Sequence, residues 1–245
     1  MGSSYKITVS LFLLSLLISV SSFAEQVILQ GTNQMDDTWL YDGRYLGEGD
    51  VVQLQMRTWI KHVLFRFDLS GIPSGLNTMI DSTELRLDIQ TVRADHSSIP
   101  IDVHFVTKPW NEYGSSWYVY DDPTPSNPGS GDELAWDTPG GDYEAVPAVT
   151  LYLPAKNAWE EDSITELTPM IQDWVDGARP NYGLLIKYRV ETGGPEDYGF
   201  NWGASEWLAH VQPVLTINYH SLVPEPATVM LILAGAIGFI LRKKK

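Results

Sequence analysis

Five separate stretches of this 245-residue chain alternate apolar and other residues with a period of two. Successive side chains of a β-strand point to opposite faces, so this alternation gives each strand one apolar face to bury. Turn-forming Gly and Pro residues separate the stretches, as at residues 71–75, 123–131 and 139–141. The pattern predicts an all-β domain built as a two-sheet sandwich. The apolar positions are Val63, Phe65, Phe67 and Leu69; Leu85, Leu87 and Ile89; Ile101, Val103 and Phe105; Leu184, Ile186 and Tyr188; and Leu215, Ile217 and Tyr219.

Two segments depart from this alternation. Apolar residues between Ile164 and Val175 have helical spacing, and Thr168, Pro169 and Gly177 predict a short helix over residues 169–176, with Thr168 as its N-cap. Residues 114–142 are rich in Pro, Gly, Ser and Asp, which predicts a long surface loop with a short strand near residues 134–136.

The N-terminus has the pattern of a signal peptide. Lys6 precedes an apolar run at residues 7–20, and Ser22 and Ala24 are small residues at the positions that signal peptidase reads. We therefore expect residues 1–24 to be removed, leaving a mature chain that begins near Glu25. An uncut N-terminal anchor is the alternative.

The C-terminus combines three elements in order. Pro224, Glu225 and Pro226 precede an apolar run at residues 227–241, which as a helix would rise about 22 Å, short for a hydrocarbon core of about 30 Å. A basic cluster ends the chain and should remain cytoplasmic. This cluster consists of Arg242, Lys243, Lys244 and Lys245.

These three elements resemble the PEP-CTERM sorting signal of exopolysaccharide-producing Gram-negative bacteria. The resemblance implies that residues 221–245 form a sorting tail with a short transmembrane helix. It also implies an exosortase that cuts at Pro-Glu-Pro and passes the protein to the cell surface or extracellular matrix. An ordinary C-terminal anchor helix is the alternative.

Composition excludes several classes of function. The formal net charge of -15 disfavours nucleic acid as a partner. The absence of cysteine excludes disulfides, thiolate zinc sites and thiol nucleophiles. The sequence has no His-Glu-x-x-His or Gly-x-Ser-x-Gly motif, and its five histidines are scattered, so we expect no enzyme.

The middle of the chain carries a further resemblance, spread over seven short motifs. Their order resembles that of the DNRLRE family of exported bacterial domains, which is related to a group of carbohydrate-binding modules. The resemblance covers residues 27–219 and implies a jelly-roll β-sandwich over residues 25–220; some members of the group bind acidic polysaccharides such as alginate. Its Trp-Glu…Thr-Trp element is weakened here to Trp110-Asn111-Glu112 and Ser115-Ser116-Trp117. The motifs are LFRFDLSGIP at 64–73, DSTELRL at 81–87, PWNE at 109–112, IQDWVDG at 171–177, NYGLLI at 181–186, SE at 205–206 and PVLTINY at 213–219.

Basic residues occupy outward positions of the predicted strands. A guanidinium pairs bidentately with a carboxylate, so one sheet face is a candidate site for an acidic glycan. The alternative is a cross-strand charge ladder in which Asp68 and Asp88 neutralise the two arginines. The basic candidates are Arg66, Arg86, His104 and Lys187, with Arg189 beside them.

Nine tryptophans are many for this length, and an exposed ring can stack against a sugar. For any one of them, packing in the core is the alternative. The candidates for stacking are Trp39, Trp202 and Trp207, followed by Trp59 and Trp117, whereas Trp110 and Trp174 are expected to be core anchors.

Acidic residues flank the glycines of an early loop and could offer oxygen ligands to calcium. Asp36, Asp37 and Asp42 are the candidate ligands, with Glu48 and Asp50 nearby. A solvated acidic loop is the alternative, and no other cofactor is expected.

Together these patterns predict an exported, surface-sorted, non-catalytic β-sandwich that binds or organises (acidic) polysaccharide in the extracellular matrix. The expected partners are signal peptidase, exosortase, polysaccharide and, through the C-terminal helix, the membrane. A structural biofilm protein without a specific sugar ligand is the alternative, and a polysaccharide lyase or hydrolase is a third.

Overall fold

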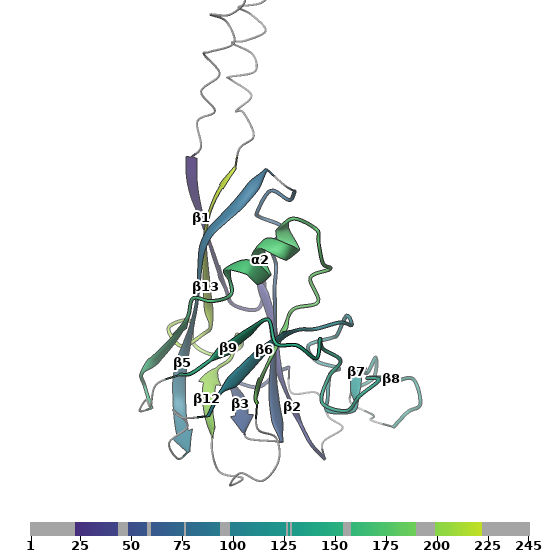
Figure 1. The fold of residues 1–245 in the computed structure, drawn as a ribbon. Helices are drawn as coiled ribbons and strands as arrows, with labels where there is room; N and C mark the ends of the chain where they lie inside the picture. The colour runs from purple at the N-terminus through teal and green to yellow at the C-terminus, as the bar shows by residue number, and fades with distance from the viewer. Residues whose placement is uncertain are drawn as a thin grey trace, which may run out of the picture.

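A computed structural model describes residues 23–43, 49–57, 60–75, 77–93, 99–125, 127, 129–153, 158–189 and 199–221. Most of the predicted signal peptide and almost all of the predicted sorting tail lie outside these residues. Strands dominate the described part of the chain, together with a single helix (Figure 1). The predicted all-β class is therefore confirmed.

The strands are β1 (Phe23–Gln30), β2 (Met35–Tyr41), β3 (Gln53–Arg57), β4 (Lys61–Phe67), β5 (Thr78–Arg93), β6 (Ile101–Phe105), β7 (Val119–Asp121), β8 (Leu134–Ala135), β9 (Val149–Leu151), β10 (Glu161–Ile164), β11 (Leu184–Tyr188), β12 (Gly199–Gly203) and β13 (Val214–Ser221), and the helix is α2 (Thr168–Val175).

Hydrogen bonding joins eleven of these strands into one curled antiparallel sheet. The order is β1-β13-β5-β12-β3-β4-β11-β6-β9, with β10 paired to β5 and β2 paired to β4. The 16-residue strand β5 joins β1 and β13 to the rest of the sheet, because β13 and β10 pair with its first part and β12 with its last residues. The predicted two-sheet sandwich of jelly-roll type remains a prediction.

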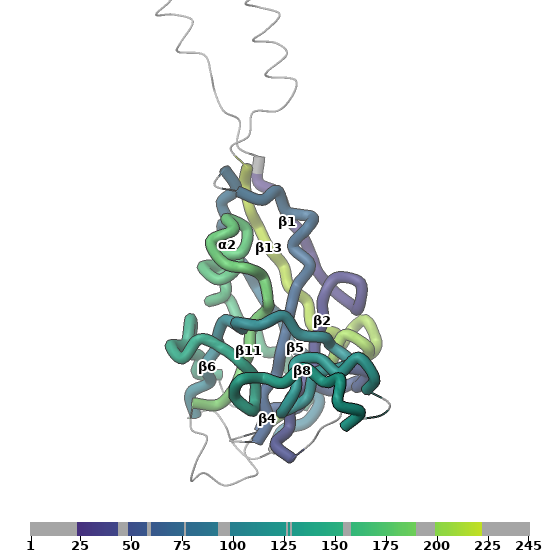
Figure 2. The backbone as a smooth tube through the Cα atoms, turned by 90° about the vertical axis from the view of Figure 1, so that its right-hand side faces the viewer, coloured from purple at the N-terminus to yellow at the C-terminus, as the bar shows by residue number. Residues whose placement is uncertain are grey.

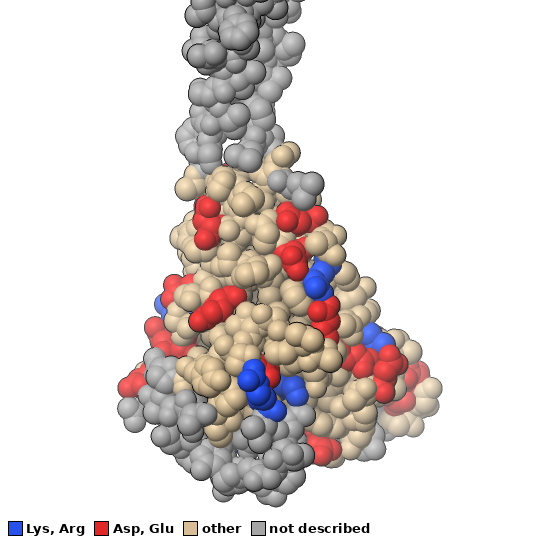
Figure 3. Space-filling model, viewed as in Figure 1, with Lys and Arg blue, Asp and Glu red and all other residues tan. Residues whose placement is uncertain are grey.

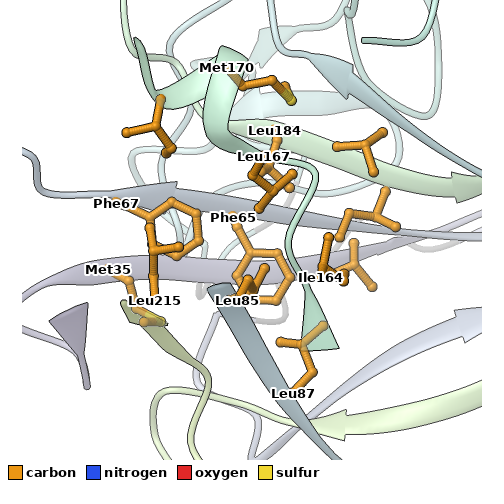
Figure 4. Close-up of a cluster of buried hydrophobic side chains, with 14 of the residues drawn as sticks. Met35, Phe65, Phe67, Leu85, Leu87, Ile164, Leu167, Met170, Leu184 and Leu215 are labelled. Carbon is orange, nitrogen blue, oxygen red and sulfur yellow. The ribbon is translucent and has the colours of Figure 1, made fainter. Parts of the chain in front are cut away.

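The alternating apolar residues form the core inside the curl, as predicted. Phe65 and Phe67 of β4 meet Leu85 and Leu87 of β5, and Leu215 of β13 lies beside them (Figure 4). All five side chains are at most 1% exposed, and burying each one contributes roughly 1.5–3 kcal/mol relative to leaving it in water.

The helix α2 covers one end of this core. Its Met170, Ile171 and Trp174 are buried, and the Gln172 side chain accepts the Ile80 N–H and donates to the Thr78 carbonyl of β5. The predicted helix is confirmed to within one residue, and Gly177 follows it with a positive φ of 72°. The predicted N-cap is wrong, because the Thr168 hydroxyl accepts the Thr83 N–H of β5 at 3.1 Å and Leu167 takes the cap position.

Residues 106–144, which include the segment predicted as a long surface loop, form a cover over the sheet. Most of its described residues between 123 and 135 are exposed, as predicted, whereas the parts on either side supply buried residues. Trp110, Trp136 and Val106 lie against Leu64 and Leu185, on the outer face of β4 and β11. The Trp136 indole donates to the Ser116 carbonyl at 2.9 Å, which ties the cover together. Figure 2 shows this teal segment, with β8, crossing in front of the sheet. The short strand expected near residues 134–136 is present as β8.

Strands β1 and β13 are antiparallel, with Phe23 opposite Ser221. Their outer ends lie together at one end of the domain, whereas β7 and β8 lie well away from that end (Figure 1). Acidic side chains are spread over the visible face and outnumber basic ones there (Figure 3).

Candidate functional site

Arg66 and Asp36 form the centre of a polar site on the outer face of the sheet. They are opposite each other on β4 and β2, and Arg66 Nε donates to Asp36 Oδ2 at 2.7 Å. Arg66 Nη1 donates to the Trp110 carbonyl at 3.0 Å, and the guanidinium lies 5.0 Å from the Trp110 ring centroid. The arginine is therefore held by the strand beside it and by the cover above it.

Two surface hollows flank this ion pair. The first has a volume of about 420 Å³ and is lined by the ends of β2 and β4, by the adjoining Gln34 and Asp68, and by Asn181, which precedes β11. The second has a volume of about 540 Å³, and Tyr113 on its rim is half exposed. Its lining also includes Trp110, Asn111, Glu112, Tyr120, Asp121 and Leu134.

Two of the other predicted basic residues share the outer face with Arg66 but are buried under the cover. His104 Nδ1 lies 2.7 Å from the Glu144 carbonyl oxygen, and burial lowers the pKa of His104. The Lys187 ammonium lies 5.2 Å from the Tyr143 ring centroid. Neither side chain presents a charge to a large ligand, because the cover segment lies over both of them.

Arg86 does not join this group. It lies on β5, which β12 and β3 separate from β4 in the sheet order, and its Nε is 3.4 Å from Glu161 of β10. The structure therefore does not form the single basic face that the sequence predicted. The alternative charge ladder is present with different acids, since Asp36 and Glu161 replace Asp68 and Asp88.

The predicted stacking tryptophans require correction. Trp39 and Trp202 are 4% and 0% exposed, so neither ring has a free face for a sugar. The Trp202 indole donates to Asp162 Oδ2 at 3.0 Å inside the core. Both residues lie at strand positions whose side chains point inward, and apolar burial prevails at such positions.

The other tryptophans divide between the core and the surface. Trp207 is partly buried, Trp117 is partly buried against His62, and Trp59 lies outside the described residues. Trp110 and Trp174 are core anchors, as predicted. Among the described tryptophans the most exposed is Trp159, at 71%, which was not among the candidates because no strand pattern surrounds it.

The three predicted calcium ligands are not brought together. Asp36 and Asp37 are neighbours on β2, so their side chains point to opposite faces, and Asp36 binds Arg66. Asp42 is exposed beyond the end of β2, and Glu48 lies outside the described residues. Asp37 instead meets two acids from distant segments, Glu112 and Glu206.

Asp37, Glu112 and Glu206 form a buried acidic group. One carboxylate oxygen from each lies within 4.8 Å of the others. Glu112 Oε1 accepts the Asp37 N–H at 2.7 Å, and Asp37 Oδ2 accepts the Ser205 N–H at 2.9 Å. Sequence reasoning found one of the three residues, because the other two become neighbours only through the fold.

Burial dominates the electrostatics of this group. It raises the pKa of Asp37 well above its usual range, and the charge of Glu206 adds to the shift. Burial also raises the pKa of Glu112 to about 7, with further contributions from Glu206 and Asp36, and it raises the pKa of Glu206. The site therefore favours a proton or a cation over three free negative charges.

Comparison with known families locates one motif. The PEP-CTERM protein-sorting motif matches residues 222–245 and confirms the sorting signal that the sequence predicted. It marks the chain as an exported protein that an exosortase sorts at the membrane. Comparison with curated proteins gives no match. In the part of the chain that the structure describes, no helix is long and apolar enough to cross a membrane.

Proposed function

We propose that this exported protein is a non-catalytic polysaccharide-binding protein of the extracellular matrix. We propose that it binds sugar in the second of the two hollows beside Arg66, the one of about 540 Å³. The observation that carries the proposal is the lining of that hollow, which combines aromatic rings with amide and carboxylate groups. We further propose that residues 25–220 form a jelly-roll domain related to DNRLRE-type domains. Signal peptidase removes residues 1–24, and the protein reaches the cell surface after exosortase cuts the tail.

The groups in the hollow suit a polyhydroxyl ligand. Tyr113 is half exposed at the rim and offers a ring against which the C–H face of a sugar can stack. Asn111 and Asp121 supply hydrogen-bonding groups for hydroxyls beside it. A few polar groups among aromatic side chains are the usual lining of a small-ligand site.

The charges favour a neutral sugar over an acidic one. The Arg66 guanidinium is already bound to Asp36 and to the Trp110 carbonyl, so it has no free fork for a sugar carboxylate. Glu112 and Asp121 add negative groups to the same lining. An acidic glycan would therefore meet repulsion without a compensating bidentate pair.

The position of the hollow is compatible with sorting through the tail. Tyr120 and Asp121 of β7 and Leu134 of β8 line it, and these strands lie away from the end of β13, from which the tail continues. A protein held by its C-terminus would keep this face available to the matrix.

A structural matrix protein without a specific sugar is the second candidate. The ion pairs of Arg66 with Asp36 and of Arg86 with Glu161 favour it, because both arginines are already used within the fold.

Binding to immobilised glycans tests the proposal. The full chain is applied to neutral β-glucans and mannans and to alginate and pectate, with Tyr113→Ala as the site variant. Tyr152→Ala is the control, since Tyr152 is exposed and lies outside the hollow. We expect retention on a neutral glycan, weakened roughly tenfold by Tyr113→Ala and unchanged by Tyr152→Ala.

Each other result has a distinct meaning. Retention on no glycan supports the structural role, and retention on alginate alone contradicts the preference for neutral sugars. Release of reducing ends or unsaturated products would show a hydrolase or lyase and overturn the non-catalytic assignment.

A further inference from the structure

The acidic group of Asp37, Glu112 and Glu206 joins three segments that are far apart in the sequence. Asp37 lies on β2, Glu112 follows β6 in the cover, and Glu206 follows β12. One oxygen of each carboxylate lies within 4.8 Å of the others, and the Asp37 N–H and Ser205 N–H bonds fix two of the three side chains. The arrangement is therefore a built site, held by the fold.

Oxygens in this group lack partners. Asp37 is 1% exposed, and its Oδ2 is bound by Ser205, whereas its Oδ1 is sealed from solvent and accepts no hydrogen bond of good geometry from the described residues. Both carboxylate oxygens of Glu206 are also sealed from solvent and accept no hydrogen bond of good geometry from the described residues, although the Ser205 hydroxyl lies near enough to oppose the rise in the pKa of Glu206. Buried carboxylates without donors or counter-charges are costly, so such a group calls for a ligand of opposite charge.

Arg66, the basic side chain that acts on Glu112, does not supply that charge. Arg66 acts on Glu112 electrostatically, but its guanidinium donates to Asp36 and to the Trp110 carbonyl. It lies on the outer face of β4, opposite to the face on which Asp37 points from β2.

We propose that Asp37, Glu112 and Glu206 bind a divalent cation, and that this cation is Ca²⁺. Calcium takes oxygen ligands at about 2.3–2.6 Å, so two ligands on opposite sides of one ion are at most about 5 Å apart. The observed limit of 4.8 Å matches that span. The ligands are all oxygens, as hard cations prefer, and water can complete the coordination shell.

The cation would connect the edge of the sheet to the cover. Glu112 lines the 540 Å³ hollow beside Arg66 and is also one of the three ligands, so the ion would hold one residue of the hollow's lining in place. This role does not depend on sugar binding, because the same contacts tie β2 to the segment after β12.

Thermal unfolding of the full chain tests the proposal, in EDTA and in millimolar calcium chloride near pH 8. We expect calcium to raise the melting temperature by roughly 5–10 °C at saturation. Asp37→Asn should abolish the shift. Asp132→Asn is the matched control, because Asp132 belongs to the other acidic group of the described residues and should leave the shift intact.

Calorimetric titration with calcium chloride gives the second measurement. One ion should bind per wild-type chain and none per Asp37→Asn chain, with Glu206→Gln as the replacement if Asp37→Asn does not fold. No heat and no shift in calcium, magnesium or manganese would overturn the proposal. So would a shift that survives both ligand variants, or one that Asp132→Asn removes.

Discussion

Two acidic groups in this protein contain the same number of carboxylates and differ in how their oxygens are used. In the group at residues 37, 112 and 206, burial raises every pKa and several oxygens lack donors. In the group of Asp122, Asp132 and Glu133, a turn supplies the donors. Thr124 donates to Asp122 and Asp132, Ser130 donates to Asp132, and Gly129 and Gly131 donate to Glu133.

The pKa values follow from this difference. Hydrogen bonds from Ser130 and Thr124 lower the pKa of Asp132, and backbone N–H groups lower that of Glu133, beginning with its own. A carboxylate that already accepts several hydrogen bonds gains little from a cation and must give up donors to bind one. Counting acids therefore predicts a metal site poorly, whereas counting unoccupied buried oxygens separates the two groups.

The largest effect is expected on the pH dependence of the unfolding free energy of the metal-free protein in EDTA. The pKa of Glu112 rises from 4.5 to about 7 on folding, so its contribution to stability is complete below about pH 4.5 and is lost as the pH rises through 7. Burial is the main cause of this rise in pKa; the charges of Glu206 and Asp36 add to it, whereas the Asp37 N–H and the charge of Arg66 reduce it.

The difference in unfolding free energy between wild type and Glu112→Gln, measured in EDTA from pH 4 to 8, isolates this contribution. We expect this difference to change by on the order of 3 kcal/mol between pH 4 and pH 8. The wild type should become less stable relative to Glu112→Gln as the pH rises. A flat difference would mean that folding does not raise the pKa of Glu112.

Two glycines support the two groups and allow a matched test. A Cβ on Gly49 would lie 2.3 Å from the Glu112 carbonyl oxygen, and a Cβ on Gly114 would lie 2.6 Å from the Asp122 nitrogen. Each alanine variant should cost about 1–3 kcal/mol through overpacking. Only Gly49→Ala should reduce the calcium-induced rise in melting temperature. If only Gly114→Ala reduced it, calcium would bind at the Asp122 group and not at the Asp37 group.

Period-two alternation was enough to locate five strands and their buried faces. Val63, Phe65 and Phe67 are core residues because side-chain direction in a strand is fixed locally. The helix was also predictable, since Pro169 fixes φ at its first turn and Gly177 permits the positive φ that follows its end.

The site was less predictable, because its residues meet only in three dimensions. Glu112 and Glu206 are 94 positions apart, and no local pattern places both beside Asp37. The same reason explains why Trp202 was expected at the surface, since its partner Asp162 comes from a distant strand. The tail was identified from sequence alone because a sorting motif is read as a linear signal.

A smaller effect is expected from removing one charge of the buried group. In EDTA at pH 8, Asp37→Asn should stabilise the protein by about 1 kcal/mol, because it removes the cost of burying this charge and the repulsion with Glu206 and Glu112 while its side-chain oxygen keeps the Ser205 N–H. Urea unfolding measures this, with Asp122→Asn as the control that should show no gain. Destabilisation by Asp37→Asn would show that the carboxylate is already paired with a positive charge in the metal-free protein.

The smallest effect is expected in the exposed group, and its sign on the pH axis is opposite. Because hydrogen bonds lower the pKa of Asp132, its contribution to stability is present above about pH 4 and is lost as the pH falls through the folded-state value. Asp132→Asn should therefore change the melting temperature by less than about 2 °C at pH 7, since the carboxylate is exposed to solvent. A shift of more than about 5 °C would mean that the turn at residues 124–133 supports the cover as strongly as the buried group does. The two acidic groups would then differ in the pKa shifts of their carboxyls but not in how strongly they stabilise the surrounding structure.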